Sequence, residues 1–101
     1  MEISWGDIME LNYKELEDLC EILKVLAHPV RLCIVKGLAE HGGCNVSKMQ
    51  ECLNMPQSTV SQHLGKLRAA GIIHGERKGL EIIYKVKNEK IIKIVKSICE
   101  T

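Results

Sequence analysis

The sequence lacks phenylalanine and holds only three aromatic residues, Trp5, Tyr13 and Tyr84. Proteins that bind single-stranded nucleic acid stack bases on several aromatic side chains, so this scatter argues against that class. No apolar run approaches the roughly 20 residues needed to cross a bilayer, and residues 1–10 are acidic where a secretory signal is basic. The sequence therefore predicts a cytoplasmic protein with no membrane partner.

Motifs of catalysis are also missing. The sequence shows no nucleophile and base motif, no phosphate-binding loop and no paired carboxylates, and its 101 residues leave little room for a substrate cleft. We expect no enzyme activity and no cofactor. With 46% hydrophobic and 27% charged residues, the composition is that of an ordinary globular protein and predicts a single domain over residues 1–101.

The five cysteines have no regular spacing, and in a reducing compartment they should be thiols. Cys33 and Cys52 stand beside leucine or isoleucine, so we expect both to be buried as small hydrophobic residues. Cys44 follows two glycines, and we expect it to be exposed near His41, where a weak soft-metal or redox site is conceivable.

Charge is uneven along the chain, although the net charge is only +1. Residues 1–23 carry seven acidic residues against Lys14 alone, about −6, whereas residues 56–87 carry six basic against two acidic residues, about +4. A locally basic segment in a nearly neutral protein is typical of a surface that binds duplex DNA, and it also fits plain solvation.

Apolar periodicity predicts four helices before residue 71. Residues 13–26 form an amphipathic helix, and Pro29 begins a second helix that residues 41–43 end. Ser47 and Gln50 resemble a capping box that opens a short third helix. The fourth helix, from about 57 to 70, places Val60, Leu64 and Leu67 on one face, and Gly71 ends it.

Residues 72–86 alternate around Lys78-Gly79 and predict a β-hairpin, and residues 89–100 form a last helix that Asn88 caps. The fold class is therefore α+β, mainly α: four helices, two strands and a final helix, the layout of a winged helix-turn-helix with a two-stranded wing. Residues 1–12 are expected to be an N-terminal extension. The helices at 13–26 and 89–100 carry more apolar surface than one small core can bury, so we expect them to form a homodimer interface.

The fourth predicted helix has a polar face whose side chains can hydrogen-bond base edges in the major groove. These candidate DNA-binding residues are Gln57, Ser58, Thr59, Ser61, Gln62, His63 and Lys66. Three further candidates are basic and better suited to contact DNA phosphates: Arg68, and Arg77 and Lys78 at the tip of the wing. His63 can equally be a buried hydrogen-bonded residue, a phosphate contact or a base contact, and Ser and Thr near a helix start can serve capping alone.

These segments resemble the ArsR/SmtB family of winged helix-turn-helix regulators. The resemblance covers about residues 13–99 and is carried by LAHPVRL at 26–32, PQSTVSQHL at 56–64, LRAAGII at 67–73 and RKGL at 77–80. It implies a homodimer that binds double-stranded DNA at an inverted-repeat operator, usually as a repressor released by a signal, with the first and last helices at the dimer interface.

The family's metal sites are missing from the sequence. Asn45 and Ser47 stand where metal-sensing members have two cysteines, and residues 88–100 contain no histidine or aspartate. We therefore expect no metal response at the standard sites. Cys20 and Cys99, in the two helices expected at the dimer interface, are candidates for sensing thiol-reactive species. A different alternative is a winged-helix module that binds protein instead of DNA.

Overall fold

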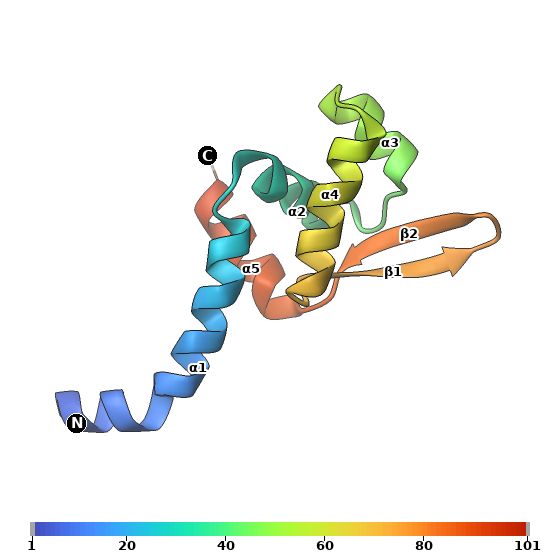
Figure 1. The fold of residues 1–101 in the computed structure, drawn as a ribbon. Coiled ribbons are helices and arrows are strands. Elements are labelled where there is room, and N and C mark those ends of the chain that lie inside the picture. Colours follow the sequence, from blue (N-terminus) through green and yellow to red (C-terminus); the bar gives the residue numbers. More distant parts are fainter. Residues whose placement is uncertain (1, 101) are drawn as a thin grey trace.

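A computed structural model describes residues 2–100, with the side chains of all of these except residues 8–12. Met1 and Thr101, the two ends of the predicted domain, lie outside the described residues. Within residues 2–100 the order is four helices, an antiparallel hairpin and a fifth helix, which confirms the predicted fold class (Figure 1). The elements are α1 (Trp5–Leu26), α2 (Pro29–His41), α3 (Val46–Leu53), α4 (Gln57–Ala69), β1 (Ile73–Lys78), β2 (Glu81–Val86) and α5 (Glu89–Cys99).

The first helix is longer than its apolar periodicity predicted, because α1 begins at Trp5 and not at residue 13. Ser4 is its N-cap and accepts a hydrogen bond from the backbone N–H of Asp7 at 3.1 Å. An oxygen-bearing cap with an acidic residue in the first turn stabilises the positive end of a helix. Residues 5–12, predicted to be an extension, are therefore helical.

The third helix also begins differently from the prediction. Its N-cap is Asn45, whose Oδ1 accepts a hydrogen bond from the backbone N–H of Lys48 at 2.8 Å, and Ser47 lies inside the helix. The predicted capping box of Ser47 and Gln50 is therefore wrong. Asparagine is at least as good a cap as serine, and here it stands two residues earlier.

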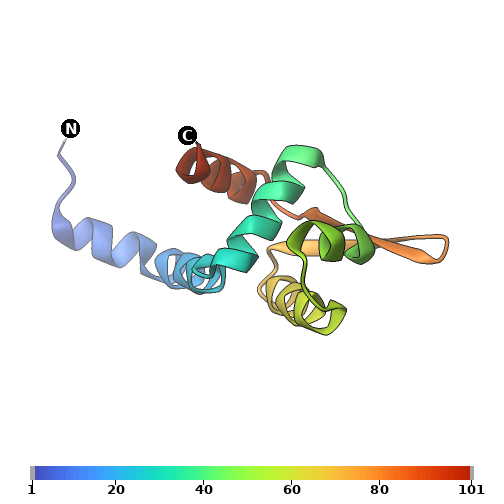
Figure 2. The ribbon, with the colours of Figure 1, turned by 90° about the horizontal axis from the view of Figure 1, so that it is seen from above.

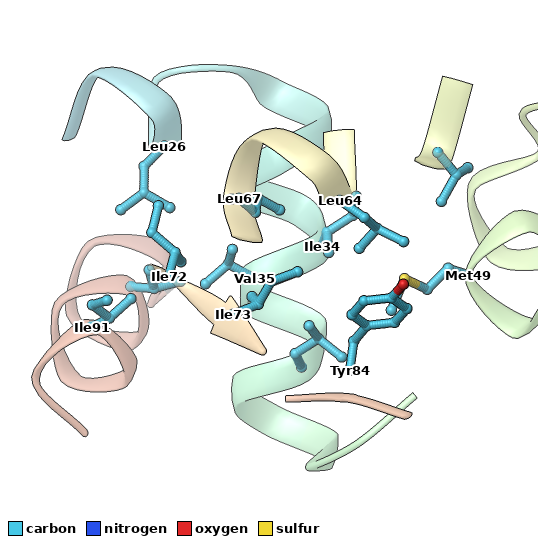
Figure 3. Packing of buried hydrophobic residues seen from close by; sticks show 13 residues of the cluster. Leu26, Ile34, Val35, Met49, Leu64, Leu67, Ile72, Ile73, Tyr84 and Ile91 are labelled. Carbon is cyan, nitrogen blue, oxygen red and sulfur yellow. The ribbon is translucent and has the colours of Figure 1, made fainter. Parts of the chain in front are cut away.

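A single hydrophobic core joins α2, α4, α5 and the hairpin (Figure 3). Val60, Leu64 and Leu67 of α4 are all buried, as their spacing predicted. The side chains that are completely shielded from solvent come from four of the elements and the turn before β1: Val35, Val60, Leu67, Ile72, Ile73 and Val95. One face of α4 is thus anchored, and its opposite face is left to solvent.

The hairpin packs on the core only near its base, so the alternation of apolar residues did not predict which of its side chains are buried. Leu80, Ile82, Tyr84 and Val86 alternate with other residues as on the buried face of a strand, but Leu80 is 99% exposed and Ile82 39% exposed. Tyr84 is buried and Val86 half-buried, because only the base of the hairpin packs against α2 and α3. The distal half projects beyond the core and leaves these apolar side chains exposed.

The molecule is elongated, with principal extents of 52 × 28 × 21 Å. The hairpin projects from one side, and α1 and α5 lie on the other side in both views (Figures 1 and 2). No helix in residues 2–100 is long and apolar enough to cross a membrane.

Candidate nucleic-acid interface

The polar face of α4 is presented to solvent. Among the eight candidate residues of this helix, Thr59 and His63 are half-buried and the other six are exposed: Gln57, Ser58, Ser61, Gln62, Lys66 and Arg68. The buried face of Val60, Leu64 and Leu67 fixes the rotation of the helix about its axis. An exposed row of amide, hydroxyl and basic side chains on a rigidly anchored helix can form hydrogen bonds with base edges.

A tight turn joins α3 to α4. Asn54 ends α3 in the left-handed region, at φ 52° and ψ 50°, a conformation that asparagine tolerates better than most residues. The carbonyl of Pro56 then accepts hydrogen bonds from the N–H groups of Thr59 and Val60 at 3.1 and 3.2 Å. No side chain caps α4, so other N–H groups of its first turn remain available to an oxygen ligand.

The hairpin presents basic side chains near its tip. Gly79, at φ +66°, closes the turn between Lys78 and Glu81, which are paired across the hairpin. Arg77 and Lys78 are both exposed there. Farther down, Lys85 forms an ion pair with Glu76 at 3.3 Å. Arg77 and Lys78, which form no ion pair with the side chains that the structure describes, therefore lie where the wing projects farthest from the core.

Two contacts hold the wing to the start of α3. Cys44 and Tyr84 exchange backbone hydrogen bonds of 3.1 and 2.8 Å, and Asn45 Nδ2 donates to Glu81 Oε1 at 2.9 Å. A Cβ on Gly43 would lie 2.5 Å from a methyl group of Ile83, so only glycine allows this approach without a shift. The helix-turn-helix and the wing are thus mechanically connected.

His63 joins the recognition face to the beginning of α2. Its ring lies 4.7 Å from the ring of His28, and its Nδ1 is 3.5 Å from Nη1 of Arg31. Arg31 Nε also donates to the carbonyl of Val25 at 2.6 Å. Burial lowers the pKa of His63, and His28, Arg31 and Lys66 lower it further. These contacts favour a neutral imidazole that positions α4.

Arg31 was not singled out for a role by the sequence analysis. A signal was available, since an arginine between Val30 and Leu32 interrupts an apolar stretch at the start of a helix. Its partners, however, lie 6 and 32 positions away along the chain, beyond the reach of helical periodicity.

The cysteines lie differently from the prediction. Cys33 and Cys52, expected to be buried, are exposed, because both line an open cavity and neither packs in the core. Cys44, expected to be exposed, is half-buried beside the wing, and it lines the same cavity as His41. Within residues 2–100, no three His, Cys, Asp or Glu side chains are grouped so as to hold a metal ion.

Cys20 and Cys99 occupy different settings. Cys20 is exposed on α1, and Cys99 is half-buried near the end of α5, where it packs against the core. Both are free thiols. Their role in sensing thiol-reactive species stays a prediction.

The helix-turn-helix segment matches a known family. Residues 26–76 match the model of a helix-turn-helix domain. The chain is also similar to the transcriptional repressor PagR of Bacillus anthracis, with 46% identity over 87 residues that cover 86% of this chain and 87% of PagR. The crystal structure of PagR superimposes with a TM-score of 0.79 over 85% of this chain and 98% of that one.

Two further repressors are similar to this chain. The repressor SmtB of Mycobacterium tuberculosis is 44% identical over 75 residues, which cover 74% of this chain and 55% of SmtB. The crystal structure of the repressor BigR from Xylella fastidiosa is 31% identical, with a TM-score of 0.79 over 95% of this chain and 93% of that one.

Proposed function

Since this chain belongs to the ArsR/SmtB family of winged helix-turn-helix transcriptional regulators, we propose that it is a repressor that binds an inverted-repeat operator as a homodimer in the cytoplasm. The observation that carries this proposal is the joint presentation of one polar helix face and one basic hairpin tip by a single rigid core. In such a complex, α4 enters the major groove and the wing follows the neighbouring backbone.

We assign the roles within this interface by side-chain chemistry. Gln57, Ser58, Ser61 and Gln62 are exposed on α4 and carry donors and acceptors suited to base edges. Lys66, Arg68, Arg77 and Lys78 are cations suited to phosphates. Thr59 and His63 are half-buried. Because His63 already has partners inside the protein, we propose that it positions the helix and does not contact a base.

An exposed apolar stripe supports the homodimer. Tyr13, Leu16, Cys20 and Leu23 recur at three- and four-residue steps on α1 and are all exposed. Ile98 is 66% exposed on α5, the helix that lies with α1 on the side of the molecule away from the hairpin. Exposed apolar area of this kind, rimmed by charge, is typical of a protein interface.

Selection of binding sites from a random duplex pool, followed by footprinting, tests this proposal. We expect a selected consensus with two-fold symmetry and half-sites about one helical turn, or a small multiple of it, apart. The complex should contain two chains per duplex in sedimentation. Recovery of no enriched sequence, or of an asymmetric site bound by one chain, would contradict the proposal and favour a protein-binding module. We propose no catalytic activity for this chain.

A further inference from the structure

A cavity of about 550 Å³ opens between α2 and α3, on residues that the proposed DNA contacts do not use. Three of the five cysteines line it: Cys33 from α2, Cys44 from the loop and Cys52 from α3. The wall around them is apolar and includes Ile34, Leu38 and Leu53. The volume is within the roughly 300–1,000 Å³ range of small-molecule sites, which are mostly apolar with a few polar groups.

The polar groups of this cavity are few and chemically distinct. They are thiols, the ammonium of Lys48 and the imidazole of His41. The thiols come from three separate elements and are not gathered into one ligand set. The cavity as a whole, and not one coordination point within it, is therefore the feature that a ligand would recognise.

We propose that this cavity binds a small apolar carbonyl electrophile, a quinone or an α,β-unsaturated ketone, which Cys52 captures covalently. The apolar wall takes the carbon skeleton, and Lys48, one turn before Cys52 on α3, is placed to donate to the carbonyl oxygen. An exposed thiol beside an apolar cavity and a cation combines access to solvent with a binding site for the reagent.

The reaction is an addition and needs no other reactant. The sulfur of Cys52 loses its proton and forms a bond to the β-carbon of the ligand, while the carbon–carbon π bond breaks. Its electron pair moves toward the carbonyl oxygen as an enolate, and a proton from water then completes the adduct. Lys48 stabilises the developing negative charge in this step.

Cys44 is the less reactive thiol of the cavity. It is half-buried and its Sγ donates to the carbonyl of Asn45 at 3.4 Å. Burial raises the pKa of its thiol, and the neighbouring Cys52 raises it further. Fewer thiolates are therefore present at neutral pH on Cys44, and the thiolate is the nucleophile.

An adduct on Cys52 would act on the DNA-binding surface, an effect that rests on the proposed function. Cys52 lies two residues before the left-handed Asn54 that sets the turn into α4. Cys44, which also lines the cavity, is hydrogen-bonded through its backbone to Tyr84 of the wing. A ligand that separates α2 from α3 therefore moves the recognition helix relative to the wing, and we expect weaker DNA binding.

Peptide mapping of the intact protein tests the site. The chain is treated with limiting 1,4-benzoquinone and, separately, with iodoacetamide, a small polar reagent that gains nothing from the cavity. The measured quantity is the rate of labelling by quinone divided by the rate of labelling by iodoacetamide. We expect this ratio to be about tenfold or more higher at Cys52 than for free cysteine, because the quinone is held beside the thiol before it reacts. A ratio equal to that of free cysteine would overturn the proposal.

Gly37→Leu gives a matched control. Gly37 lines the cavity, and a Cβ placed on it meets no atom within 4 Å, so a larger side chain has room to start there and should occupy part of the cavity. The variant should retain its helix content and lose the preference of Cys52 for quinone. Cys44→Ser should keep that preference. A Gly37→Leu protein that is still labelled selectively would contradict binding in the cavity.

The effect on DNA is measured on a duplex selected in vitro. Quinone treatment should weaken binding by the wild type about tenfold or more and leave Cys52→Ser unchanged. Labelling with no loss of affinity would refute the coupling to α4. If the untreated protein bound no duplex, the proposed function would fail, and the labelling ratios would still decide on the cavity.

Discussion

Gln62 and Arg77 contact different parts of a duplex in the proposed complex, so their substitutions should be distinguishable. Gln62→Ala removes a side chain suited to a base edge and should cost about 1–3 kcal/mol on the selected site while relaxing sequence preference at one position. Arg77→Ala removes a phosphate contact. It should weaken binding to all duplexes and flatten the dependence of the affinity on salt.

These two variants are compared by titration of selected and scrambled duplexes at several salt concentrations. Both side chains are exposed, so neither substitution should alter folding. Equal losses on selected and scrambled duplexes for Gln62→Ala would contradict its role in base contact. An unchanged salt slope for Arg77→Ala would remove the wing tip from the interface.

His63 should make stability depend on pH. Its pKa in the folded protein lies below the ordinary value of about 6.5, chiefly because of burial, so the unfolded chain takes up this proton at a higher pH than the folded protein does. The free energy of unfolding should therefore fall as pH drops below about 6.5, and this contribution is lost in full below the folded pKa. Neutral His63 is the stabilising form.

Denaturant unfolding between pH 8 and pH 5 measures this contribution. His63→Gln should show a shallower loss of stability over that range than the wild type, since glutamine does not titrate. His41→Gln, at the exposed end of α2, is the control for losing one histidine. Parallel curves for the wild type and His63→Gln would contradict the assignment.

At the scale of an element, the start of α3 depends on Asn45. Its side chain caps the helix through Lys48 N–H and binds Glu81 of the wing. Asn45→Ala should lower the free energy of unfolding by about 0.5–2 kcal/mol, the usual cost of losing a cap. Ser47→Ala, two residues later, should change it by less than about 0.5 kcal/mol because Ser47 is exposed and makes no cap.

Asn45→Asp separates the two contacts of this residue. A carboxylate keeps the cap but loses the amide donor and repels Glu81, so the helix should persist while the wing is loosened. Amide hydrogen exchange should show faster exchange in β2 with little change in α3.

If Ser47→Ala were as destabilising as Asn45→Ala, the helix would begin differently from the structure.

The whole molecule is expected to be a dimer through α1 and α5. Ile98→Glu places a carboxylate in the proposed interface, where an unpaired buried charge costs about 3 kcal/mol or more. It should convert a dimer to a monomer at micromolar concentration in sedimentation velocity. Leu80→Glu is the matched control, since Leu80 is 99% exposed at the wing tip, far from α1 and α5.

Loss of the dimer should also weaken DNA binding. Ile98→Glu should lose most affinity for a two-half-site duplex because the two recognition helices are no longer held at a fixed spacing. Leu80→Glu should remain dimeric. A monomeric wild type, or an Ile98→Glu protein that stays dimeric, would contradict the interface.

Much of the molecule was determined by the sequence alone, through patterns that act locally. The spacing of Val60, Leu64 and Leu67 predicted the buried face of α4, and Gly71 adopts the positive φ of 73° expected after a helix. The polar face opposite these residues follows at once, because a helix with one anchored side exposes the other. Fold class and the candidate DNA-binding surface were therefore within reach of periodicity and turn chemistry.

Only the tertiary structure decided which distant residues meet. Arg31 reaches His63 across 32 positions, Cys44 pairs with Tyr84, and Asn45 binds Glu81, and no helical or strand period links such partners. Cys33 and Cys52 each stand beside a leucine along the chain, yet both thiols are exposed, because burial depends on which side of a helix faces the core. Periodicity fixes the faces of an element, whereas packing decides what each face touches.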